Sequence, residues 1–170
     1  MRVDYSYLPQ QFEDSELIFA DLRELVASSE FTLGPYVERF EKKFAEYIGV
    51  RHAIGTNSGT DALILALKSL DVGPGDEVIT TPFSFIASAN SILHVGATPV
   101  FADIDPRSLC LGPAKAEAVI TPKTKGILGV EVFGNTTHMD RLAQIARRHE
   151  LALIEDCCEA LGGRHKGDPV

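Results

Sequence analysis

The sequence predicts an α/β fold of three layers, in which helices cover both faces of a mainly parallel sheet, preceded by a helical N-terminal arm. From residue 50 onward, short apolar segments alternate with amphipathic ones, which is typical of strands joined by helical crossovers. Before residue 50, apolar side chains recur at helical spacing. A chain of 170 residues can fill one core well but not two. We therefore expect an arm over residues 1–49 and an α/β domain over residues 50–170.

Two helices are predicted in the arm. The first covers residues 16–27 and carries Leu17, Leu22, Leu25 and Val26 on one stripe. The second begins at Pro35, a residue favoured in the first helical turn, and ends before Gly49. Its apolar residues follow the helical period: Val37, Phe40, Phe44 and Ile48.

The rest of the chain alternates between predicted strands and predicted helices. The expected strands are residues 53–54, 77–81, 99–102, 126–133 and 151–155, and the expected helices are residues 62–70, 85–95, 113–119 and 139–149. Glycine and proline between residues 72 and 77 predict a tight turn from helix to strand. The sequence shows no internal repeat and no low-complexity linker, so we expect a single domain after the arm.

Composition excludes several classes of protein. The formal net charge is -8 and the chain has no basic stripe, which argues against a nucleic-acid or anionic-membrane partner. The three cysteines have neither a disulfide pattern nor metal-ligand spacing, and the adjacent Cys157 and Cys158 are expected to be small buried fillers. The N-terminus, Met1–Asp4, lacks a signal peptide, and no segment is long enough to span a membrane. We expect a cytoplasmic protein without a metal site.

The segment from Ser58 to Asp61 lies at a predicted strand-to-helix junction. One interpretation is a capping box, in which Ser58 caps the helix and Asp61 returns the hydrogen bond. Gly59 weakens that interpretation, because glycine in a first helical turn is best explained by a close approach of the backbone to another group. A phosphate held by the free amides and by the hydroxyls of Ser58 and Thr60 is the alternative.

Two further residues follow predicted strands at the edge where ligands of open parallel sheets collect. Asp156 comes directly after the apolar strand, and it either caps the next turn or pairs with a ligand such as a protonated heterocyclic nitrogen. Phe85 follows the strand at residues 77–81, and it either packs in the core or stacks on a planar ring.

In addition, the sequence resembles the N-terminal half of the DegT/StrS-type nucleotide-sugar aminotransferases, which are pyridoxal phosphate (PLP) enzymes of fold type I. The resemblance extends from about Phe31 to the last residue. The segments that carry it are TLGPYVERFE at 32–41, NSGTDAL at 57–63, GPGDEVI at 73–79, GATPVF at 96–101, DIDP at 103–106, Met139-Asp140 and IED at 154–156.

The resemblance implies a role for each matching position. Ser58, Gly59 and Thr60 would hold the PLP phosphate, Phe85 would stack on the pyridine ring, and Asp156 would pair with the pyridine nitrogen. Glu159 stands where the family often has glutamine or histidine near the phenolic oxygen, and Glu131 stands where a histidine is common. The Schiff-base lysine of the family would lie beyond this chain, as would its small C-terminal domain. Lys166 belongs to a different turn and is expected to be a surface lysine.

The resemblance implies a function as well. The complete protein would be a PLP-dependent aminotransferase that transfers an amino group from an amino-acid donor, glutamate or glutamine, to a nucleotide-linked keto-sugar, and it would be a homodimer. This chain would be its N-terminal fragment, inactive by itself. Two alternatives stay open: a sugar dehydratase on the same fold, and a non-catalytic or regulatory member of the family. A dinucleotide-binding domain is disfavoured, because no G-x-G-x-x-G follows the first strand.

Overall fold

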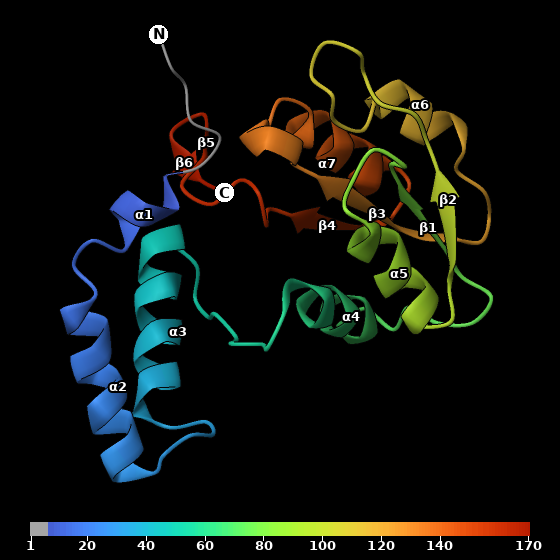
Figure 1. The fold of residues 1–170 in the computed structure, drawn as a ribbon. Coiled ribbons are helices and arrows are strands. Elements are labelled where there is room, and N and C mark those ends of the chain that lie inside the picture. Colours follow the sequence, from blue (N-terminus) through green and yellow to red (C-terminus); the bar gives the residue numbers. More distant parts are fainter. Residues whose placement is uncertain (1–6) are drawn as a thin grey trace, which may run out of the picture. The chain divides into compact units, whose positions relative to one another are not determined.

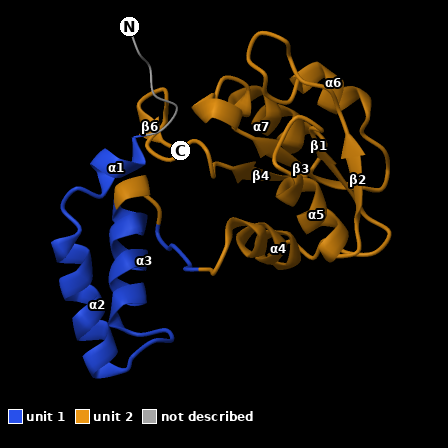
Figure 2. Ribbon diagram, viewed as in Figure 1, with its two compact units in different colours: residues 1–46, 51–55 blue, residues 47–50, 56–170 orange. Residues whose placement is uncertain are grey.

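The computed structural model describes residues 7–170. Residues Met1–Asp4, on which the expectation about a signal peptide rests, lie outside the described residues. Figure 2 shows two compact units, one made of residues 1–46 and 51–55 and the other of residues 47–50 and 56–170. No helix in the described part of the chain is long and apolar enough to cross a membrane.

The first unit is helical. It contains α1 (Leu8–Gln11), α2 (Glu16–Ser28) and most of α3 (Pro35–Ile48), and the bounds of α2 and α3 confirm the two predicted helices. The Tyr36 hydroxyl joins them, because it donates to the Asp21 carbonyl at 3.3 Å and lies 3.1 Å from Glu24 Oε2. The strand expected at residues 53–54 is absent. Its neighbour Gly55 donates its amide to Glu41 Oε1 at 2.7 Å instead of to a strand.

The second unit is built on a four-stranded parallel sheet. Its strands are β1 (Glu77–Thr80), β2 (Thr98–Phe101), β3 (Thr124–Val130) and β4 (Ala152–Asp156), in the order β2-β1-β3-β4. All four lie where the sequence predicts strands. A short antiparallel pair, β5 (Arg164–His165) with β6 (Asp168–Pro169), was not predicted.

Helices cover both faces of this sheet (Figure 1), as the three-layer prediction requires. α4 (Gly59–Ser69) and α5 (Ile86–His94) pack on one face, where Leu67 and Ile92 bury Val78 and Leu128. α6 (Pro113–Ala118) and α7 (Met139–Arg148) contribute to a second core on the other face. Ile79, the strand neighbour of Val78, belongs to that second core, because successive side chains of a strand point to opposite faces.

The strand register decides which loops meet. In the β3–β4 pair, Val130 lies opposite Asp156, so both strands end at the same edge of the sheet. After β3 the chain makes a short 3-10 turn, η1 (Val132–Gly134), and after β4 it turns at Cys157 and Cys158. The N-termini of α4 and α5 reach the same edge. Four segments that are distant in sequence therefore meet there.

Candidate functional site

A cavity of about 580 Å³ lies at this carboxyl edge, within the second unit. Five of the six predicted site residues line it: Gly59, Thr60, Phe85, Asp156 and Glu159. The sixth, Ser58, is not part of the lining and immediately precedes α4. The topology thus brings together residues from α4, from the start of α5 and from the segment that ends β4 and follows it, which are up to 100 positions apart.

The N-terminus of α4 has the serine cap of the predicted capping box, but Asp61 bonds to the Ser58 hydroxyl and not to the Ser58 amide. Ser58 is extended, its Oγ accepts from the Asp61 amide at 3.1 Å, and Oγ lies 3.2 Å from Asp61 Oδ2. The hydroxyl is therefore already used within the helix start. The interpretation of Ser58 as a helix cap thus agrees with the structure. The phosphate interpretation then rests on Thr60 at the cavity wall and on amides of the first turn, because such amides have no partner within a helix.

Gly59 has a neighbour that the sequence could not indicate. A Cβ atom added at this position would lie 3.0 Å from Cys158 Sγ, on the loop after β4. The sequence predicts that another group comes close to the backbone at Gly59. In the structure, the Cys158 side chain is such a group. Cys158 is exposed and lines the cavity, so it is not the buried filler that the sequence predicts.

Asp156 ends β4 with its side chain almost buried, at 8% exposure. Ser88 Oγ donates to Asp156 Oδ2 at 2.9 Å, and the Cys158 amide donates to Oδ1 at 3.3 Å. Ser84 Oγ lies 2.7 Å from Ser88 Oγ and extends this chain of hydroxyls. Sequence reasoning missed both serines. Nothing in the first turn of α5 indicates that Ser88 faces a strand 68 positions away, and Ser84 precedes that helix. These two donors to the carboxylate, the Ser88 hydroxyl and the Cys158 amide, are neutral groups.

Aromatic side chains stand around the cavity. Phe85 precedes α5 as its N-cap residue and is 73% exposed, so it does not pack in the core. Phe83 and Phe133 meet edge to face with ring centroids 6.3 Å apart. Phe133 adopts a left-handed backbone conformation with φ of 58°, which is uncommon for a bulky residue and marks a position held by its surroundings. Neither Phe83 nor Phe133 was predicted as a site residue, although both line the cavity.

Two acidic residues at this edge, Glu159 and Glu131, differ in how far they are buried. Glu159 is exposed and lines the cavity. Glu131 is 1% exposed, and burial, with the nearby carboxylate of Glu155, raises its pKa above the ordinary value.

No lysine lines the cavity within residues 7–170. Lys166 lies in the turn between β5 and β6, is largely exposed and pairs with Asp140, so its position at the surface is as predicted. The described cavity therefore offers a helix N-terminus, an exposed aromatic ring and a buried carboxylate, without a primary amine.

Comparison with known proteins places the chain in one family and finds similar proteins of that kind. A family model described as the DegT/DnrJ/EryC1/StrS aminotransferase family matches residues 13–170. The chain is 51% identical over 136 residues to a protein of Caulobacter vibrioides described as GDP-perosamine synthase, a match that covers 80% of this chain and 37% of the relative.

Solved structures have the same fold. DesV of S. venezuelae, solved in complex with a ketimine intermediate, superposes with a TM-score of 0.94 at 39% identity over 99% of this chain and 46% of that one. The structure of ntda from Bacillus subtilis with bound cofactor PMP gives a TM-score of 0.87 at 42% identity, covering 89% of this chain and 35% of that one. The chain thus spans less than half the length of each of these three proteins.

Proposed function

We propose that this chain, which belongs to the DegT/DnrJ/EryC1/StrS aminotransferase family, forms the cofactor-binding part of a PLP-dependent aminotransferase that acts on a nucleotide-linked keto-sugar. The observation that carries the proposal is the single cavity that unites the N-terminus of α4, Phe85 and Asp156. These groups match the chemistry of PLP at separate points, namely its phosphate, its flat ring and its basic ring nitrogen.

The phosphate would lie at the N-terminus of α4. The free amides of the first turn and the partial positive charge of the helix end favour an anion there. Thr60 lines the cavity and adds a hydroxyl, while Ser58 keeps the helix start in place through its bonds with Asp61. Gly59 presents no side chain in this turn, which leaves its amide accessible to a phosphate oxygen.

The ring would lie between Phe85 and the end of β4. An exposed aromatic face stacks readily on a flat heterocycle, and the nearly buried carboxylate of Asp156 can hold a proton on the ring nitrogen by pairing with it. Ser88 fixes the orientation of that carboxylate through its 2.9 Å hydrogen bond. When bound, PLP supplies the electron sink for moving the amino group. Glu159 would stand near the phenolic oxygen, where one of the two groups must carry a proton.

We further propose how the chain is divided into domains and what the complete protein contains. Residues 1–49 would form a helical arm and residues 50–170 the PLP-binding large domain. None of the lysines of this chain would form the Schiff base, so that the catalytic amine would come from further sequence of a longer, cytoplasmic, homodimeric protein. Glutamate or glutamine would be the amino donor. The three free cysteines agree with a reducing compartment.

The deciding experiment is an assay of the product of the complete gene with PLP, an amino donor and nucleotide-linked keto-sugars. Mass spectrometry of the sugar nucleotide gives the readout. Formation of an amino sugar, together with the keto acid from the donor, supports the proposal. Loss of a hydroxyl group without amination would identify a dehydratase, and failure to bind PLP at all would overturn the assignment of the cavity.

A further inference from the structure

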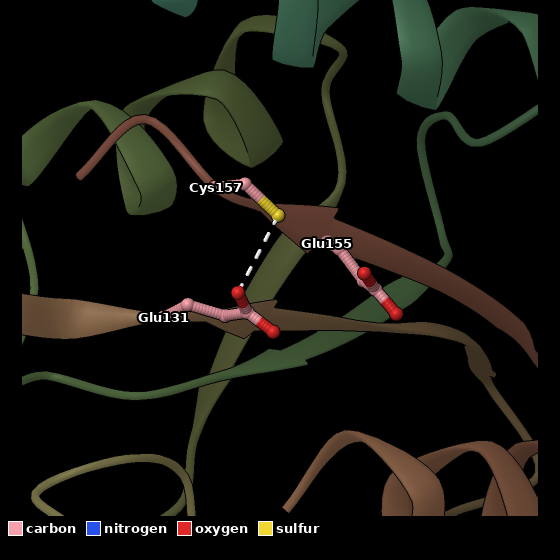
Figure 3. Close-up of side chains that lie close together, drawn as sticks. All are labelled: Glu131, Glu155 and Cys157. Atoms are coloured by element: carbon pink, nitrogen blue, oxygen red, sulfur yellow. Dashed lines mark hydrogen bonds between the residues drawn. The ribbon is translucent and has the colours of Figure 1, made fainter. Parts of the chain in front are cut away.

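A second group of reactive side chains lies beside β3 and β4, apart from the Asp156 carboxylate. It consists of Glu131, Glu155 and Cys157, whose side chains converge from adjacent strand ends (Figure 3). One potential ligand atom from each lies within 4.8 Å of the other two. The register explains the convergence, because Gly129 pairs with Glu155 and Val130 with Asp156, so the next step brings residue 131 beside residue 157.

Glu131 is the unusual member of this group. It is 1% exposed, yet its Oε1 has no hydrogen-bond partner among the described residues. Its other oxygen accepts a weak hydrogen bond from Cys157 Sγ at 3.6 Å. In Figure 3 the unpartnered oxygen points toward the side of the cluster where Glu155 lies. A buried carboxylate oxygen without a partner is costly, and a bound cation would satisfy it.

A small cavity of about 200 Å³ adjoins the two glutamates, and its wall also contains Asp140 and His165. His165 Nδ1 lies 3.1 Å from Thr136 Oγ1, and its Nε2 lies 3.1 Å from Asp140 Oδ1. The two glutamates are therefore reached from a pocket that has room for a water molecule, which could complete the coordination of a small ion.

We propose that Glu131, Glu155 and Cys157 bind a divalent transition-metal ion of the zinc class, at a site that shares only Glu131 with the lining of the proposed PLP cavity. A thiolate with carboxylates favours such an ion over magnesium or calcium, which take oxygen ligands. Binding replaces the S–H bond of Cys157 with a metal–sulfur bond and releases the proton to solvent.

The test is titration of the purified 170-residue chain with Co²⁺, after removal of metals with a chelator, followed by competition with Zn²⁺. We expect one Co²⁺ per chain with a thiolate-to-cobalt charge-transfer band in the near ultraviolet, and displacement of that band by Zn²⁺. Cys157→Ser should abolish the band. Cys158→Ser, the same change at the adjacent cysteine outside the cluster, should leave it intact and is the matched control.

Glu131→Gln tests the buried ligand. It should weaken Co²⁺ binding at least about tenfold, while circular dichroism in the presence of chelator shows a folded protein, because glutamine avoids burying a charge. No stoichiometric Co²⁺ binding would overturn the proposal. A band that survives Cys157→Ser, or that Cys158→Ser removes equally, would overturn it as well. None of these readouts involves PLP, so the metal site and the aminotransferase function can fail independently.

Discussion

Gly59 is a residue with two candidate reasons to lack a side chain, and substitution can separate them. Gly59→Ala brings a methyl group to 3.0 Å from Cys158 Sγ, which the exposed cysteine can relieve by moving. Alanine also gains about 0.5–1 kcal/mol of helix stability. We expect little change in melting temperature but a clear loss of PLP affinity in the complete protein, measured by equilibrium dialysis.

The double variant Gly59→Ala/Cys158→Ala is the control, because it removes the sulfur that the methyl group would meet. If phosphate binding requires the glycine, the double variant stays weak in PLP affinity relative to Cys158→Ala alone. Full recovery of PLP affinity would mean that Cys158 alone explains the glycine.

The Asp156 carboxylate is the second residue whose proposed role can be tested by substitution. In the complete enzyme, Asp156→Asn should leave the ring nitrogen without its anionic partner. Loss of one member of a buried charge pair costs about 3–5 kcal/mol, so amino transfer should fall by orders of magnitude in steady-state kinetics. Asp103→Asn, at an exposed carboxylate that pairs with Lys115, is the matched control and should have wild-type turnover. Wild-type turnover in Asp156→Asn would remove this residue from the site.

At the scale of elements, the start of α4 combines a helix cap with a proposed phosphate site. Ser58→Ala removes the acceptor of the Asp61 amide and should lower the free energy of unfolding by about 1 kcal/mol in urea titrations. Ser58→Asp preserves a side-chain cap but places a negative charge beside the proposed phosphate. We expect Ser58→Asp to unfold like the wild type and to bind PLP poorly. If Ser58→Asp binds PLP as tightly as Ser58→Ala, the added negative charge has no effect, and the phosphate does not lie beside residue 58.

For the whole molecule, we expect the complete protein to be a homodimer. The helices before residue 49 carry exposed apolar side chains such as Leu17, Val26 and Phe40, which would be covered in a dimer. Light scattering at micromolar concentration, with activity measured on the same sample, checks this expectation. An active monomer would contradict it.

The 170-residue chain should not catalyse amino transfer by itself and should bind PLP weakly at best. Imine chemistry requires a lysine amine at the cavity, and none lines it within the described residues. Borohydride reduction of PLP-treated protein, followed by peptide mapping, should find no stoichiometrically labelled lysine. Labelling of Lys166 together with turnover would show that the catalytic amine is misplaced in our proposal.

Much of the architecture could be predicted from the sequence, because it depends on local periodicity. The helix from Pro35 to Ile48 and the strands around Val78, Leu128 and Leu153 lie within a few residues of their predicted bounds. The strand at residues 53–54 was wrong, because a strand exists only where a neighbour accepts its hydrogen bonds, and Gly55 bonds to Glu41 instead. The short α1, β5 and β6 carry too few residues to show a period.

By itself, the sequence determined the parallel α/β fold and the edge at which Gly59, Phe85 and Asp156 would meet, because strand-to-helix junctions are readable from local patterns. Only the tertiary structure decided their surroundings. Packing and strand register placed Ser88 against Asp156, Cys158 against Gly59, and Cys157 beside Glu131. These contacts join residues that are 26 or more positions apart. Such neighbours are set by how the elements pack, and no local pattern records that.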